Sequence, residues 1–204
     1  MIPENRPHVA YDEIIKLVEP QSTVLDLGCG DGELLQRLWQ ERGCRGRGVE
    51  IDEGHIRTCI GKGISVFQGD LDQGLADHET HAYEYVILNQ TLQMVHRPDR
   101  LLREMIRVGR NVIIGFPNFG YYLNRLQLLF RGRMPVTGTL PYQWYETPNI
   151  HLCTLRDFRN LCADLNIHVK TEAASHKGKP ISPVAANLFA TEVCFLLVDS
   201  LKSI

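Results

Sequence analysis

The stretch Val24-Leu-Asp-Leu-Gly-Cys-Gly-Asp-Gly-Glu-Leu-Leu35 decides the fold of this chain. Its start, Val24 to Leu27, predicts a buried strand, because a short apolar run that ends at turn residues is typical of α/β sheets. Gly28, Gly30 and Gly32 then predict a sharp turn that can approach a ligand closely, since glycine has no Cβ. Leucines at helical spacing follow. The stretch therefore predicts a strand, a turn and the start of a helix, whose first N–H groups face a ligand.

The glycine spacing separates two classes of nucleotide site. Dinucleotide-binding folds use G-x-G-x-x-G, in which the last small residue packs the helix on the strand. That position is Glu33 here, and the glycines run G-x-G-x-G instead. Asp26 stands two residues before the first glycine, where a carboxylate suits a cation better than a pyrophosphate. The stretch resembles motif I of the class I S-adenosylmethionine (SAM) methyltransferases. A tight structural turn in another α/β protein is the alternative.

Two further acids follow the next two predicted strands. Glu50 lies 24 residues beyond Asp26, and an acid about 20 residues on accepts hydrogen bonds from ribose hydroxyls. NAD and SAM carry the same hydroxyls, so Glu50 fits both ligands. Asp70 follows the short strand Ser65–Gln68, where an acid of the SAM family takes the adenine amino group. A turn or helix cap is the alternative for Asp70.

The resemblance to SAM methyltransferases implies a set of binding residues. The acid before the glycines holds the methionyl amino group, the glycines make room for methionine and ribose, and Ile51 packs on the adenine. The expected cofactor is SAM or its demethylated product, S-adenosylhomocysteine, and no metal is expected. The residues implied for the cofactor are Asp26, Gly28, Cys29, Gly30, Gly32, Glu50, Ile51, Asp70, Leu71 and Asn89.

The rest of the chain alternates between strands and helices, as a doubly wound α/β fold requires. Further helices are predicted over His8–Val18, Glu53–Ile60, Asp99–Val108 and Thr154–Leu165, with Thr154 and Asp157 forming a cap of the last. Further strands are predicted at 46–52, Tyr85–Asn89, Asn111–Phe116, His168–Ala173 and Val193–Val198. Gly178–Asn187 is predicted to be a loop. The resulting fold is a mostly parallel seven-stranded sheet with helices on both faces and an antiparallel last strand.

Composition agrees with one soluble α/β domain over residues 1–204. The chain has 44% hydrophobic and 23% charged residues, which is ordinary for a globular protein. Its net charge of −2 does not favour nucleic acid, and the cluster Arg125, Arg131 and Arg133 is typical of a solvated face. The first residues resemble no signal peptide, and no apolar run reaches membrane-spanning length. Six scattered cysteines indicate reduced thiols, so a cytoplasmic location without membrane or nucleic-acid partners is expected.

Residues 118–153 form an insertion between the fifth strand and the helix at Thr154. The segment is far longer than the usual connection of roughly 2–6 residues. It includes one predicted helix, Leu123–Phe130. Insertions at the carboxyl ends of strands lie over the ligand crevice, so we expect a lid, a substrate site or a partner surface. The candidate substrate or partner residues are Arg125, Arg133, Tyr142, Trp144 and Tyr145. A structural cover whose aromatic residues fill a small core is the alternative.

Several motifs point to one family within this fold. The stretches FPNFG, RLQLLFRGRMPVT and LPYQWYETPNIHLCTLRDF, with the earlier motifs, resemble the methionine-biosynthesis protein MetW family over residues 5–175. The resemblance implies a SAM-type fold that accompanies a homoserine O-acyltransferase, MetX, and supports or activates it. It implies no particular methyl acceptor. The segment from Ser175 onward matches no informative pattern.

The sequence carries few signs of a methyl-transfer apparatus. Asn89-Gln-Thr-Leu92 departs from the Asn/Asp-Pro-Pro-aromatic motif of base amino-methyltransferases, which argues against base flipping. His151 is the candidate general base by residue type alone, and packing beneath the insertion is its alternative role. Two hypotheses remain. The preferred one is a SAM-binding adaptor of the acyltransferase, and the other is an active small-molecule methyltransferase that uses His151 and the Tyr142–Tyr145 segment.

Overall fold

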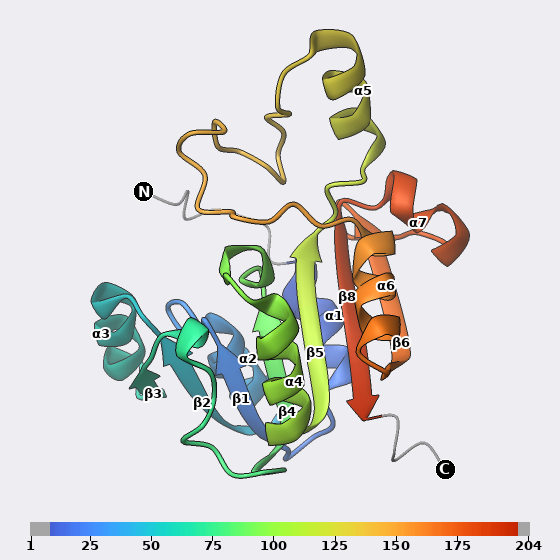
Figure 1. The fold of residues 1–204 in the computed structure, drawn as a ribbon. Helices are drawn as coiled ribbons and strands as arrows, with labels where there is room; N and C mark the ends of the chain where they lie inside the picture. Colours follow the sequence, from blue (N-terminus) through green and yellow to red (C-terminus); the bar gives the residue numbers. More distant parts are fainter. Residues whose placement is uncertain (1–8, 200–204) are drawn as a thin grey trace.

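The computed structural model describes residues 9–199, which form one mixed sheet with helices on both faces (Figure 1). The strands are β1 (Thr23–Leu27), β2 (Arg45–Glu50), β3 (Ser65–Gln68), β4 (Tyr83–Asn89), β5 (Gly109–Pro117), β6 (Ile167–His176), β7 (Lys179–Pro180) and β8 (Glu192–Asp199). The helices are α1 (Val9–Leu17), α2 (Glu33–Arg42), α3 (Glu53–Gly61), α4 (Pro98–Val108), α5 (Tyr122–Arg131), α6 (Leu155–Asp164) and α7 (Pro183–Phe189). Two 3₁₀ turns are η1 (Leu71–Gln73) and η2 (Leu92–Met94). His8, the first residue of the predicted opening helix, lies outside the described residues.

The strand order is β3-β2-β1-β4-β5-β8-β6-β7. Strands β3, β2, β1, β4 and β5 run parallel, and β8 is antiparallel to both β5 and β6. The prediction of a mostly parallel, doubly wound sheet with an antiparallel last strand is thus confirmed. The predicted count of seven strands is wrong, because the two-residue strand β7 adds an eighth that pairs only with β6.

The prediction that Gly178–Asn187 is a loop is also wrong. The segment contains β7 and most of α7, which begins at Pro183. Proline usually indicates a turn or loop. It also fits the first turn of a helix, however, because an N–H group there has no partner within the helix. The end of α7 is held from a distant part of the chain, since the Asn118 amide donates to the carbonyls of Ala186 and Ala190 at 3.4 and 2.9 Å. No local pattern could reveal these contacts.

Alternating side chains of each strand build two cores, because successive residues point to opposite faces. On one face, Val24 and Ile87 pack with side chains of α1, α2 and α3. On the other, Leu25 and Val86 pack with α4 and α6, and Phe116, Phe158 and Phe195 form a cluster there with ring centroids 4.7–6.0 Å apart. The helix at Leu155 begins with the predicted capping box of Thr154 and Asp157.

Parallel strands bring their carboxyl ends to one edge of the sheet. Figure 1 shows that α5 and the chain after it extend beyond the carboxyl end of β5, away from the sheet. The predicted helix Leu123–Phe130 is confirmed as α5, one residue longer at each end. The predicted ligand residues and the insertion therefore lie at the same edge.

Candidate functional site

Two buried acids end neighbouring strands. Asp26 lies in β1 and Glu50 ends β2, and they are 3% and 8% exposed. The strands are paired in parallel, with Asp26 opposite Gly48. The charges of the two carboxylates act on one another, since Glu50 is one cause of the raised pKa of Asp26. The structure therefore brings together the two acids that the sequence separates by 24 residues.

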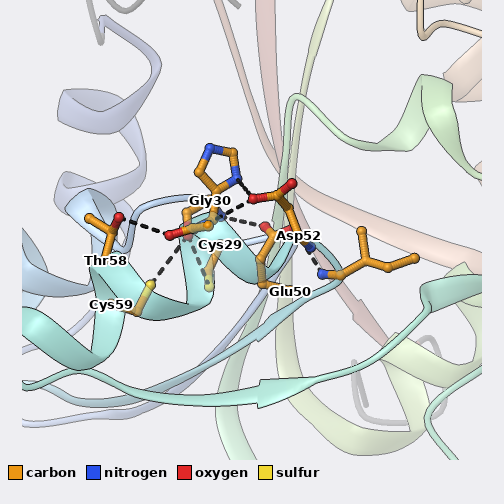
Figure 2. Close-up of polar contacts among 9 residues, drawn as sticks. Cys29, Gly30, Glu50, Asp52, Thr58 and Cys59 are labelled. Atoms are coloured by element: carbon orange, nitrogen blue, oxygen red, sulfur yellow. Dashed lines mark hydrogen bonds and ion pairs between the residues drawn. The ribbon is translucent and has the colours of Figure 1, made fainter. Parts of the chain in front are cut away.

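Glu50 anchors the glycine turn to the end of β2. One carboxylate oxygen, Oε2, accepts the Gly30 N–H at 2.8 Å, and Oε1 accepts those of Ile51 and Asp52 at 2.8 and 3.0 Å. Figure 2 shows the carboxylate between the turn and the start of α3. A carboxylate has about four lone-pair sites, so three N–H donors leave room for a further donor such as a ribose hydroxyl.

The three glycines serve different purposes, although all have positive φ angles. A Cβ on Gly28 would stand 2.7 Å from Thr91 Oγ1, and one on Gly32 would stand 2.5 Å from Ile64 Cδ1. These two glycines are needed for packing. A Cβ on Gly30 would meet no atom within 4 Å. Gly30 thus borders open space beside Glu50, as the wall of a ligand cradle does.

This difference makes a testable prediction about Gly30. Gly30→Ala should lower the free energy of unfolding by about 1 kcal/mol, because its φ of 57° is in the left-handed region. It should also weaken SAM binding, because the methyl side chain of the new alanine would occupy the open space beside Glu50. Gly63→Ala is the matched control, since Gly63 has φ 75° and equally free surroundings after α3. Equal SAM affinity of both variants by calorimetry would show that Gly30 does not border the ligand.

Asp26 is unusual because it is a buried acid without a cation. Burial, and after it the charge of Glu50, raises the pKa of Asp26 to about 8. Among the ion pairs formed by residues 9–199, none includes Asp26. An ammonium group of a ligand would supply the missing positive charge. Asp26, Gly30 and Glu50 therefore fit the methionyl and ribose parts of SAM.

Two neighbours of this site carry no sequence signal of their own. Tyr11 of α1 packs against the core cluster that contains Cys29 and Leu34, and its pKa is raised first by burial and next by the charge of Asp26. Thr91 packs on Gly28 after β4. Both come from other parts of the chain, and only the folded arrangement identifies them.

The other residues predicted for the cofactor lie around this centre. Cys29 is buried behind the turn, and Ile51 is 62% exposed at its outer side. The Asp70 carboxylate accepts the Asp72 N–H at 2.9 Å and caps η1, which begins at Leu71. One oxygen of Asp70 is thus used to cap this turn, which is the alternative to contacting the adenine amino group. Asn89 ends β4, and its buried Oδ1 has no hydrogen-bond partner among the described residues.

His151 lines a narrow and mostly apolar crevice over the ends of β4 and β5, and no residue of the glycine turn lines this crevice. The crevice is lined by Leu92, Gln93, Phe116, Leu140, Asn149 and His151, among others. The backbone N–H groups of Ile150 and His151 both donate to the Gln93 carbonyl, at 2.8 and 3.0 Å. These bonds fix the end of the insertion over η2. His151 thus lines a cavity wall, although its ring is exposed.

The candidate residues of the insertion divide into two kinds. Arg125 is used within the fold, since its guanidinium donates to the carbonyls of Gly120 and Asn187 at 2.6 and 3.4 Å. Tyr142 is half-buried. Arg133, Trp144 and Tyr145 are exposed, and the last two rings contact one another edge to face at 5.6 Å. Arg125 is therefore not only a surface residue, because its hydrogen bonds also give it a structural role.

The cysteines of the described region are buried or half-buried free thiols. Burial raises the pKa of each buried cysteine, to about 12 for Cys162 and Cys194, so these thiols are not thiolate nucleophiles at neutral pH. Residues 9–199 contain no group of three or more side chains that could hold a metal ion. No helix in that range is long and apolar enough to cross a membrane.

Comparison with known sequences identifies two relationships. A sequence model of the family described as methionine biosynthesis protein MetW matches residues 8–197. The bifunctional methionine biosynthesis protein MetXA/MetW of Rhodopirellula baltica is 37% identical over 174 residues. The match covers 81% of this chain but only 28% of that protein, so this chain corresponds to a minor part of its relative.

Comparison with solved structures identifies the fold. An S-adenosylmethionine dependent methyltransferase from Mesorhizobium loti superposes with a TM-score of 0.69 at 14% identity, covering 94% of this chain and 98% of that one. A SAM dependent methyltransferase from Archaeoglobus fulgidus gives a TM-score of 0.65 at 18% identity, with coverages of 92% and 90%. At such low identity the likeness establishes the methyltransferase fold alone.

Proposed function

The chain belongs to the family of the methionine biosynthesis protein MetW, and from this membership we propose that it is a SAM-binding protein that supports homoserine O-acyltransferase. The observation that carries the ligand half is the convergence of Asp26, Gly30 and Glu50 at the ends of β1 and β2. Asp26 is buried without a cation, the space beside Gly30 is free, and Glu50 is placed to accept hydrogen bonds from ribose hydroxyls. These three features match one ligand that carries an ammonium group and a ribose. When bound, SAM or S-adenosylhomocysteine would occupy this edge, and SAM would supply an electrophilic methyl group.

The partner half rests on the relative from Rhodopirellula baltica. That protein is named for both a MetXA and a MetW function, and this chain matches 28% of its length. Joining two modules in one chain raises the effective concentration of each near the other. A separate chain of the same family would need a binding surface to reach the same acyltransferase.

The proposal is tested with the purified full chain and the homoserine O-acyltransferase of the same organism. Calorimetry with SAM, S-adenosylhomocysteine and NAD should give binding of a sulfur nucleoside and weaker or no binding of NAD. Acylation of homoserine should be faster with this chain than without it. Preference for NAD would overturn the ligand assignment, and an unchanged acylation rate would overturn the supporting role.

A second function, methyl transfer to a small acceptor, is favoured by one observation. The side-chain oxygen of Gln93 is buried in the crevice and has no hydrogen-bond partner among the described residues. Buried acceptors are nearly always paired, so a ligand with an N–H or O–H group would complete this one. His151 lines the same crevice and could accept a proton there.

His151→Ala separates the two functions. In the adaptor, stimulation of acylation should survive the change, because no chemical step depends on the imidazole. In a methyltransferase, loss of a general base should lower the rate roughly 10²–10⁴-fold while SAM affinity stays nearly unchanged. The measurement is transfer of a labelled methyl group from SAM to metabolites of the homoserine pathway and to the acyltransferase. Acylation of homoserine is measured in parallel. Labelled product that disappears in the variant would favour the methyltransferase.

A further inference from the structure

Helix α5 exposes its apolar side chains. Leu126, Leu129 and Phe130 are 40, 74 and 76% exposed. Their spacing of i, i+3 and i+4 places them on one side of the helix. We call these three residues the outer face of α5. A helix of a globular protein normally turns such a stripe toward the core, so this face is not explained by folding.

The buried side of α5 is polar. Asn124 is fully buried, and its amide donates to the Phe119 carbonyl at 3.1 Å and accepts from the Thr137 hydroxyl at 3.4 Å. The start of the helix is tied to α7 through the bond of Arg125 to Asn187, and to the preceding turn through the bond of Arg125 to Gly120. These polar contacts and the packing of Tyr122 on Phe189 of α7 hold α5 in place, and the outer face is left for another surface.

The charge around this face restricts what can cover it. The sequence contains no Asp or Glu between Glu104 and Glu146, whereas the exposed residues Arg131 and Arg133 follow the outer face of α5 directly. A twofold dimer through this face would bring like charges together, because the same patch meets itself. The complementary surface is therefore apolar with acidic residues at its rim, on a different protein.

We propose that the outer face of α5 is the docking surface for the homoserine O-acyltransferase, through an apolar, acid-rimmed patch on that enzyme. This inference rests on the proposed function. The position of α5 supports it, since the helix extends away from the sheet beyond the end of β5 (Figure 1).

The test compares two double variants of the full chain. Leu129→Ser with Phe130→Ser should weaken binding to the acyltransferase by roughly tenfold or more, as buried aromatic and aliphatic anchors do at interfaces. Trp39→Ala with Ile60→Ser is the matched control, because these side chains are each 64% exposed on α2 and α3. Thermal unfolding and SAM affinity should be unchanged in both. A photo-crosslinking residue at position 130 should capture the acyltransferase, and one at position 39 should not.

Charge reversal provides an independent measurement. Arg131→Glu with Arg133→Glu should slow association and reverse its dependence on salt, because the acidic rim then repels the variant and added salt screens that repulsion. If the Leu129/Phe130 variant and the Arg131/Arg133 variant both bind the acyltransferase as tightly as wild type, the docking surface is overturned and the proposed function still stands. A wild-type chain that does not bind the acyltransferase would instead overturn the proposed function. Loss of a self-associated species in the Leu129/Phe130 variant would identify a second copy as the occupant and overturn the proposal.

Discussion

Asp26→Asn should weaken SAM binding by about 1.5–3 kcal/mol and stabilise the ligand-free protein at alkaline pH. The first effect follows because a charge-assisted bond to the ligand ammonium is lost. The second follows from the pKa of Asp26, which burial and Glu50 raise from 3.8 to about 8. A variant that binds less tightly but folds more stably would identify a residue kept for its ligand.

The sign of the pH effect is as follows. Below about pH 4 the carboxyl is protonated in both the folded and unfolded states. Between about 4 and 8 it is ionised only in the unfolded chain, so wild-type stability falls as pH rises, by up to about 1.4 kcal/mol per pH unit. Asp26→Asn lacks this loss, so the difference in unfolding free energy between variant and wild type should grow from pH 4 to pH 8.

Urea denaturation at several pH values measures this difference. Asp77→Asn is the control, because Asp77 is an exposed carboxylate away from the strand ends. Calorimetry in two buffers of different ionisation enthalpy adds a second readout. A bound cation lowers the pKa of Asp26, so SAM binding near pH 7 should release a proton in wild type but not in Asp26→Asn. An identical pH dependence of stability in the two proteins would show that Asp26 is ionised before the ligand arrives.

Glu50→Ala should weaken both SAM binding and folding. The change removes the acceptor of the Gly30, Ile51 and Asp52 N–H groups and of the expected ribose hydroxyls. We expect a loss of about 1–3 kcal/mol in SAM affinity, together with a lower unfolding free energy, since buried N–H groups without partners are costly. Calorimetry and urea denaturation measure the two effects separately.

Glu50→Gln is the companion variant. Its carbonyl oxygen can retain the bonds to Ile51 and Asp52, whereas its NH₂ group cannot accept from Gly30. It should therefore keep most of the stability and recover only part of the SAM affinity. Removal of the Glu50 charge should also lower the pKa of Asp26, which makes stability less dependent on pH. If Glu50→Ala binds SAM as tightly as wild type, Glu50 serves the glycine turn alone.

The sequence alone was sufficient for most of the sheet and for placing at its edge the acids and glycines that we propose to bind SAM. Strand periodicity, the G-x-G-x-G turn and the acids at two strand ends are local patterns, and parallel strands place their carboxyl ends together whatever fills the loops. The capping box at Thr154 and helix α5 were predictable for the same reason, because capping and helical spacing depend on neighbours within one turn. Family motifs between residues 116 and 158, with the earlier motifs, identified the family, which the match over residues 8–197 confirms.

Tertiary structure alone decided how these residues are used. Helix α7 was missed because Asn118, far away in the chain, satisfies its final carbonyls. Arg125 has a structural role through its hydrogen bond to Asn187, and Tyr11 is brought near the charge of Asp26 because α1 packs against α2 and β8. Exposure is likewise set by the whole fold. The leucines of α5 have a helical spacing that normally faces a core, but the buried side of this helix is held by hydrogen bonds of Asn124 and the leucines are exposed. Burial and hydrogen bonding between distant segments depend on three-dimensional packing, which no local pattern encodes.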